Sequence, residues 1–172
     1  MQRPGVPRVG LGYDVHPFAP IGSDRPLVLG GVVIPDCVGL VGHSDADAVA
    51  HAVADALLGP RGHDDLGTLF PASDSRYAGA NSMELLTRCV AKVVRSGWLV
   101  SNVDVVITAE RPRLAPYLSE MRINVAEALA ALAIEPDGGV FVSITPKRGE
   151  GIGSIGRAEG IEVRAVALLV SR

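Results

Sequence analysis

A polar loop that runs directly into a helix, residues 42–58, constrains this chain more than any other stretch. It begins Gly-His-Ser-Asp-Ala-Asp. Ser44 or Asp45 can cap a helix start, because their side-chain oxygens accept hydrogen bonds from the free N–H groups of the first turn. Gly59-Pro60 ends the pattern, since glycine favours a C-cap and proline cannot continue a helix. The sequence therefore predicts a helix from about Asp45 to Leu58.

This helix is expected to have one polar side and one apolar side. Asp47, His51 and Asp55 follow one another at i, i+4 and i+8, so they share a face. The apolar side is formed by Val49, Val53, Ala56 and Leu57. A polar side with a single histidine is most often a solvated face, so it indicates no site by itself.

A second motif, upstream of the helix, suggests that the histidine is a metal ligand. Residues 8–15 are typical of a strand, in which alternate side chains point the same way, so Asp14 and His16 share one side. Together with His51 they offer one carboxylate and two imidazoles. Zinc accepts this ligand set and keeps a fourth position open, as a catalytic metal requires. Cys37 and Cys89 match no zinc finger and are too few for a disulfide framework.

Composition excludes several classes of protein. The 172 residues are 48% hydrophobic and 20% charged, which is typical of a globular chain, and we expect one domain over residues 1–172. The net charge of −3 and the absence of long basic runs argue against nucleic acid and anionic membranes as partners. The first seven residues lack the apolar core of a secretory signal, so we expect a reducing, cytoplasmic setting.

The order of the expected elements favours an α+β fold. We expect a mixed four-stranded sheet with helices on one face, plus a small β-hairpin that turns at Gly30-Gly31. The second helix begins at Asn81 or Ser82, with Ser82 able to cap it. The strands are expected at 9–15, 27–29, 32–34, 98–109, 140–144 and 161–170, the helices at 45–58, 82–97 and 114–132, and long loops at 61–74 and 147–158.

These motifs resemble those of the 2-C-methyl-D-erythritol 2,4-cyclodiphosphate synthase family, and the resemblance extends from about Arg8 to Val170. The motifs that carry it are Gly-Tyr-Asp-Val-His at 12–16, His-Ser-Asp-Ala-Asp at 43–47 with His51, Asp-Ala-Leu-Leu-Gly at 55–59, Asp-Leu-Gly at 65–67 and Gly-Arg-Ala-Glu-Gly at 156–160.

The resemblance implies a homotrimer with its active sites between neighbouring subunits. It implies Zn²⁺ on Asp14, His16 and His51, and Mg²⁺ or Mn²⁺ on Glu150. The implied substrate is 4-diphosphocytidyl-2-C-methyl-D-erythritol 2-phosphate, whose 2-phosphate attacks the inner diphosphate, releases CMP and closes a cyclic diphosphate. His43 and Arg148 are the implied catalytic residues.

The resemblance also implies a substrate-binding set on several loops. Its members are Asp14, His16, His43, Ser44, Asp65, Leu66, Gly67, Phe70, Asp74, Ala109, Arg113, Lys147, Arg148, Gly149, Glu150, Ser154 and Arg157. His43 and Ser44 precede a helix N-terminus, where exposed N–H groups favour phosphate. Residues 109–113 and the loop before Glu150 are expected to hold cytidine diphosphate from the adjacent subunit.

The chain departs from the family pattern in four places. Lys147-Arg148-Gly149 replaces the usual threonines before the glutamate, Ala72 replaces a carboxylate after Phe-Pro, Ser154 replaces an aromatic residue near the trimer axis, and Arg113 replaces a lysine. Lysine and arginine can also donate to phosphate, with added charge. The metal-binding half of the pattern is intact and the nucleotide-binding half is altered.

Two other functions compete with the synthase. A zinc-dependent phosphoester hydrolase would need a base near the metal, for which Asp45 and Asp47 are candidates. A non-catalytic member would be a trimer that binds metal, or senses isoprenoids, without turnover. His63 has no role in the family and is expected to be exposed.

Overall fold

The structure, a computed structural model, describes residues 6–62, 65–134 and 139–172. His63 and most of the turn before the expected strand at 140 lie outside these ranges. A single four-stranded sheet dominates the described chain, in the order β1-β6-β4-β5. Its strands are β1 (Arg8–Pro17), β4 (Trp98–Thr108), β5 (Phe141–Lys147) and β6 (Gly160–Ser171).

The sheet is mixed, as the sequence predicted. β6 pairs antiparallel with both β1 and β4, whereas β4 and β5 run parallel. The parallel pair requires a crossover, which the helix between the two strands supplies. The long central strand β6 therefore connects the strand that carries Asp14 and His16 to the strand pair that leads into the 147–158 loop.

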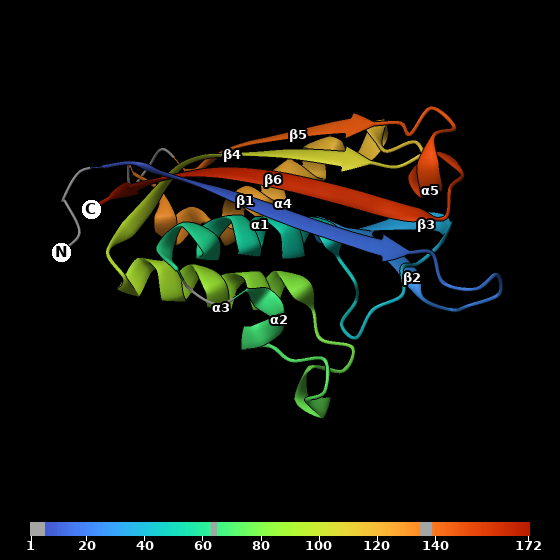
Figure 1. The fold of residues 1–172 in the computed structure, drawn as a ribbon, viewed down its shortest axis with the longest axis horizontal. Coiled ribbons are helices and arrows are strands. Elements are labelled where there is room, and N and C mark those ends of the chain that lie inside the picture. The colour runs from blue at the N-terminus through green and yellow to red at the C-terminus, as the bar shows by residue number, and fades with distance from the viewer. Residues whose placement is uncertain (1–5, 63–64, 135–138) are drawn as a thin grey trace.

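The three longest helices cover one face of the sheet (Figure 1). They are α1 (Ala48–Leu58), α3 (Ser82–Arg95) and α4 (Leu118–Ala128). α1 lies directly on β1 because Gly10 and Gly12 have no side chains. A Cβ at Gly12 would lie 1.8 Å from the carbonyl oxygen of Ala52, and one at Gly10 would lie 1.9 Å from that of Ala56. The glycines thus let His51 approach the ligands on β1.

The cap of α1 differs from the expectation. Neither Ser44 nor Asp45 caps the helix, which begins at Ala48 with Asp47 as its N-cap. The Asp47 carboxylate is fully buried and accepts hydrogen bonds from the N–H groups of Val49 and Ala50. It also accepts from Gly30 and Gly31 at 2.8 and 2.7 Å. Asp47 therefore fixes the helix start to a turn and does not belong with His51 on one polar face.

That turn joins the short strands β2 (Pro26–Leu29) and β3 (Val32–Val38), which pair antiparallel. Gly30 and Gly31 have φ values of 57° and 72°, in the left-handed region that glycine adopts without a Cβ penalty. Their N–H groups point at the Asp47 carboxylate. The turn is therefore held by the start of α1 as well as by its own strands.

The remaining differences concern element ends. The helix expected over 114–132 is interrupted: α4 is flanked by 3₁₀ turns at Ala115–Tyr117 and Ala130–Leu132, and Pro116 lies at the start of the first. Asn81, rather than Ser82, caps α3. The two long loops contain one-turn helices, α2 (Leu66–Leu69) and α5 (Gly153–Gly156), with further 3₁₀ turns at Gly59–Arg61 and Ser75–Tyr77.

The other face of the sheet carries exposed apolar side chains. Val9 and Leu11 are each 68% exposed on β1, and Phe141 is 71% exposed on β5. Leu11 pairs with the exposed Val166 on β6, so the apolar surface continues across strands. Exposed apolar patches of this kind mark interaction surfaces. No helix in the described ranges is long and apolar enough to cross a membrane.

Candidate metal centre and active site

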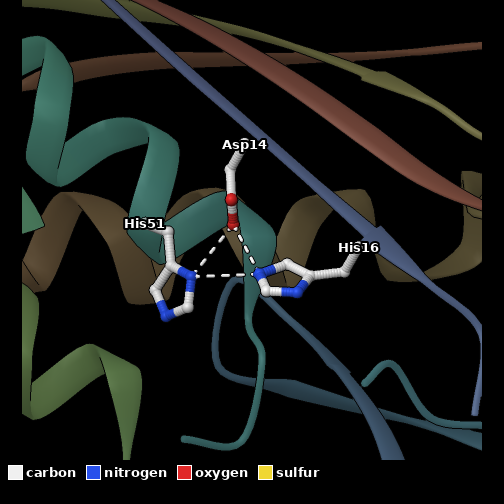
Figure 2. A group of neighbouring side chains, drawn as sticks. All are labelled: Asp14, His16 and His51. Atoms are coloured by element: carbon white, nitrogen blue, oxygen red, sulfur yellow. Dashed lines mark hydrogen bonds and ion pairs between the residues drawn. The ribbon is translucent and has the colours of Figure 1, made fainter. Parts of the chain in front are cut away.

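Asp14, His16 and His51 meet at one point between the sheet and α1. Figure 2 shows the two β1 side chains and the helix side chain pointing toward one another. Oδ2 of Asp14 lies 2.9 Å from Nδ1 of His51 and 3.0 Å from Nε2 of His16, and the two nitrogens are 3.4 Å apart. Within the described ranges this is the one group of three His, Cys, Asp or Glu side chains close enough to share a metal ion.

The hydrogen bond on the far side of His16 shows which nitrogen faces this centre as a ligand. Nδ1 of His16 lies 2.7 Å from the carbonyl oxygen of Val41. A carbonyl only accepts, so Nδ1 carries a ring proton, and Nε2, which faces Asp14, is the nitrogen left to bind a metal. Such an outer hydrogen bond is the usual way in which a metal-binding histidine is oriented. A cation between these atoms would satisfy them, so the residues fit a metal.

The electrostatics of the centre also suit a cation. Burial alone would raise the pKa of Asp14, but hydrogen bonds from His16 and His51 outweigh it and lower the pKa to about 2. Burial likewise opposes the charged form of His16, yet the hydrogen bond to Asp14 raises the pKa of His16 overall. Asp14 is therefore an ionised ligand at neutral pH.

The centre opens into a cavity of about 270 Å³. Many of the predicted substrate-binding residues line it. The lining residues are Asp14, His16, His43, Ser44, His51, Asp55, Asp65, Leu66, Gly67, Phe70, Ala72, Tyr77 and Leu85. The segment over 65–72 therefore lies over the metal centre.

Asp55 and Asp65 hold that loop in place. Asp55, one turn beyond His51 on α1, accepts a hydrogen bond from the N–H of Leu66 at 2.8 Å. Asp65 caps α2 by accepting from the N–H of Thr68 at 2.7 Å. The helical spacing placed Asp55 on the face of His51, but its contact with the loop could not be read from the sequence, because Leu66 approaches only in the tertiary structure.

The remaining predicted substrate-binding residues lie outside the cavity. None of the following lines the cavity: Asp74, Ala109, Arg113, Lys147, Arg148, Gly149, Glu150, Ser154 and Arg157. Asp74 remains near it, because its carbonyl oxygen lies 3.2 Å from Nε2 of His43. Glu150, exposed and at φ 52°, does not join the three metal-binding side chains.

Glu110 organises part of this second set; it lies in the 109–113 segment expected to hold the nucleotide, but no role of its own was predicted for it. Its carboxylate binds the guanidinium of Arg148 at 2.7 Å and accepts from the N–H of Gly149 at 3.1 Å. Arg157 pairs in a similar way with Glu159, at 2.7 Å. The sequence carried no signal for the contact with Arg148, because the two residues are 38 positions apart and the parallel pairing of β4 and β5 brings them together.

The two candidate bases of a hydrolase are both occupied by other partners. Asp47 is fully buried and accepts from four backbone N–H groups, as described above. Asp45 accepts from the backbone N–H and the hydroxyl of Ser82 and from the N–H of Asp47. These contacts use the lone pairs that would have to activate a water molecule, so the hydrolase hypothesis loses its proposed base.

Comparison with known proteins places the chain in a family. The model of the YgbB family matches residues 7–170. A protein of Thermosynechococcus vestitus named 2-C-methyl-D-erythritol 2,4-cyclodiphosphate synthase is 46% identical over 164 residues, which are 95% of this chain and 96% of that protein. A solved structure of a synthase of this name in a CDP-bound form has a TM-score of 0.79 at 33% identity, over 94% of this chain and 99% of that one.

A longer protein contains the same fold. The bifunctional IspDF from Campylobacter jejuni superposes with a TM-score of 0.87 at 36% identity. The match covers 98% of this chain and 43% of that one. Together with the metal-binding residues, these similarities show that the chain belongs to the YgbB family, the family of 2-C-methyl-D-erythritol 2,4-cyclodiphosphate synthases.

Proposed function

We propose that this chain converts 4-diphosphocytidyl-2-C-methyl-D-erythritol 2-phosphate to 2-C-methyl-D-erythritol 2,4-cyclodiphosphate and releases CMP. The observation that carries the proposal is the convergence of Asp14, His16 and His51 in a cavity, in a chain that is 46% identical to a synthase of this name. The reaction is a phosphoryl transfer, which depends on positioning and on neutralised charge more than on covalent help from the protein.

We propose Zn²⁺ as the metal at these three residues. One carboxylate and two imidazoles are a zinc ligand set that leaves one position open. Bound there, zinc supplies Lewis-acid chemistry: it holds a phosphate oxygen and polarises the phosphorus. Mg²⁺ or Mn²⁺ prefers carboxylate, phosphate and water oxygens, and Glu150 is its proposed protein ligand.

The cavity residues have a second role in this proposal, which is to place the sugar phosphate. His43 and Ser44 lie ahead of α1 and face the cavity, where they contact phosphate. His43 is proposed to be catalytic. Asp65, Leu66, Gly67 and Phe70 bind the methylerythritol part, joined at the rim by Asp74. Ala72 stands in the cavity wall where the family pattern has a carboxylate, so this chain binds the sugar with one acidic group fewer.

The nucleotide part is proposed to be bound by a neighbouring subunit. Ala109 and Arg113 follow β4, and Lys147 ends the parallel strand β5 with Arg148 and Gly149 after it, so the two segments leave the same end of the sheet. This group lies outside the cavity of its own chain. In a closed oligomer the group of one subunit would complete the cavity of the next. Arg148 is its proposed catalytic residue, and Ser154 and Arg157 are its proposed residues near the threefold axis.

We propose a homotrimer for the same reason. The exposed face of the sheet presents Val9, Leu11 and Val15 on β1 and Val166 on the paired β6, and an apolar face of this kind is typical of a surface that another subunit covers. Three copies around one axis would bury three such faces. Sedimentation at micromolar concentration tests this directly: a trimer is expected, and a monomer would contradict it.

Phosphorus NMR tests the activity. The purified protein with the cytidyl substrate and Mg²⁺ is expected to form CMP and a cyclic diphosphate, and a zinc chelator is expected to stop both. Release of a linear phosphate would show a hydrolase instead. Zinc and CMP binding without any product would show a non-catalytic member of the family.

A further inference from the structure

The side chain of Ser82 is buried beside the metal-binding face of α1. It is 0% exposed although it is the first residue of α3. It does not cap that helix, because the Asn81 carboxamide accepts from the N–H groups of Met83 and Glu84. Its hydroxyl lies 2.9 Å from Nε2 of His51 and also contacts the carboxylate of Asp45. Because the hydroxyl of Ser82 does not cap the helix, it can form a hydrogen bond with His51.

The direction of each hydrogen bond follows from the inventory of donors and acceptors. Ser82 has one hydroxyl proton, and an ionised carboxylate can only accept, so that proton goes to Asp45. When Nδ1 of His51, which lies 2.9 Å from Asp14 in the metal centre, binds the metal, the ring proton must lie on Nε2. Nε2 then donates to the Ser82 oxygen at 2.9 Å, while the Ser44 hydroxyl oxygen lies farther away, 3.2 Å from Nε2.

We propose that Ser82 and Asp45 are positioning residues for the metal: they fix the ring orientation and the tautomer of His51 and thereby strengthen binding at the centre. This inference rests on the proposed zinc site. It assigns to Asp45 the role of holding Ser82, in place of the role of a base. It makes His51 the counterpart of His16, whose outer nitrogen is held by the carbonyl of Val41.

The backbone holds the Asp45–Ser82 pair rigidly. The N–H of Asp45 donates to the carbonyl of Ala80 at 3.1 Å, and the N–H of Gly79 donates to the carbonyl of His43 at 2.8 Å. Asp45 in turn accepts from the backbone N–H of Ser82 at 3.1 Å. The loop before α1 and the loop before α3 are thus fastened together. Metal binding is consequently coupled to the first turn of α3, which carries none of the three metal-binding side chains.

The first test measures Zn²⁺ affinity by competition with a chromophoric chelator. Ser82→Ala is expected to weaken zinc binding by about 10- to 100-fold, the usual effect of removing a partner of a metal ligand. Ser96→Ala is the matched control at the other end of α3, where the hydroxyl donates to the carbonyl of Val93 at 2.7 Å. Asp45→Asn keeps an acceptor oxygen and loses the charge, so a smaller loss than that of Ser82→Ala is expected.

The second test reads the hydrogen bond itself, which a merely structural serine would not make. Long-range ¹H–¹⁵N NMR of the zinc-loaded protein is expected to show a slowly exchanging proton on Nε2 of His51 in the wild type, because the buried Ser82 oxygen accepts it. In Ser82→Ala this proton is expected to exchange faster with water, because that acceptor is gone. If Ser82→Ala does not fold by circular dichroism, Asp45→Asn is read in its place.

The outcomes separate this inference from the proposed zinc site. Zinc affinity in folded Ser82→Ala equal to that of Ser96→Ala, or an unchanged exchange rate of the Nε2 proton of His51, would overturn the role of Ser82. If His51→Ala binds zinc as tightly as the wild type, the zinc site itself is wrong and the inference falls with it. Loss of zinc in His51→Ala together with full affinity in Ser82→Ala would refute the positioning role alone.

Discussion

The metal centre and the 147–150 segment differ in how far one chain completes them. At the centre, Asp14, His16 and His51 are half-buried and point at one another, and the outer nitrogen of each ring already has a partner. In the segment, Arg148 and Glu150 are exposed, and the guanidinium of Arg148 is bound to Glu110. Folding of one chain completes the first region, whereas the second region exposes its charged side chains on the surface.

The physical cause of this difference is where the residues lie on their elements. The metal-binding side chains project from the first turn of α1 and the end of β1, and two glycines bring these elements into direct contact. The 147–150 segment starts at the last residue of an edge strand, β5, which has one neighbouring strand only. Side chains between two packed layers converge, and side chains beyond a sheet edge do not.

The largest expected effect comes from His51→Ala, which removes one of the three metal ligands. Zinc is expected to fall from about one ion per chain to near zero, and CMP release to fall by more than the roughly 100-fold that loss of a supporting residue causes. Elemental analysis and a CMP assay measure the two together. His43→Ala is the matched control, expected to keep its zinc and lose turnover. Stoichiometric zinc in His51→Ala would break the comparison, because the centre would not depend on its helix ligand.

The next effect tests whether the two regions of one site come from different subunits. His51→Ala and Arg148→Ala are each expected to be inactive, but together in mixed trimers they should regain activity. With random mixing, about one quarter of the sites receive an intact metal centre and an intact segment from its neighbour. Co-expression with two affinity tags and a CMP assay measures this. No recovery in verified mixed trimers would mean that each chain builds its own site.

A smaller effect is expected from Glu150→Gln, which removes the charge proposed to bind the second cation. Zinc content should not change, while the Mg²⁺ concentration for half-maximal activity should rise about tenfold, equivalent to about 1.4 kcal/mol of binding. Glu159→Gln, on an exposed glutamate that pairs with Arg157, is the control. A Mg²⁺ titration that coincides with the wild type would show that this segment does not reach the diphosphate.

The smallest effect concerns the pH dependence of stability at Asp55. Burial raises the pKa of Asp55 above its usual value, even though the N–H of Leu66 favours the ionised form. The folded state therefore holds this proton more tightly than the unfolded state. The contribution of Asp55 to the free energy of unfolding is greatest below pH 3.8 and declines as the pH rises through the raised pKa.

Asp55→Asn keeps an oxygen for Leu66 and should lose this decline. Urea unfolding of the metal-free protein from pH 4 to pH 8 measures it, with the exposed Asp24→Asn as the control. If the free energy of unfolding depends on pH in the same way for Asp55→Asn and the wild type, burial does not raise the pKa of Asp55.

Local pattern predicted much of this molecule. Alternation along the first strand placed Asp14 and His16 on one side, and helical spacing placed His51 on the same helix face as Asp55. These predictions depend on geometry that every strand and helix shares. The mixed sheet followed from the order of the elements. The sequence did not predict that the helix over 114–132 is interrupted, because its apolar residues continue into both flanking segments. Those segments form 3₁₀ turns, the first of which contains Pro116.

The sequence by itself determined the types of the metal-binding residues, their spacing and their likeness to a family. It predicted Ser44 or Asp45 as the cap of α1, which was wrong, because serine and aspartate cap helices about equally well and local pattern does not distinguish them from Asp47. The tertiary structure decided this, since only Asp47 also meets the N–H groups of Gly30 and Gly31. The tertiary structure likewise placed Ser82 within hydrogen-bond distance of His51 and Arg148 within hydrogen-bond distance of Glu110. Hydrogen bonds between distant segments depend on how those segments pack, and no local pattern records that.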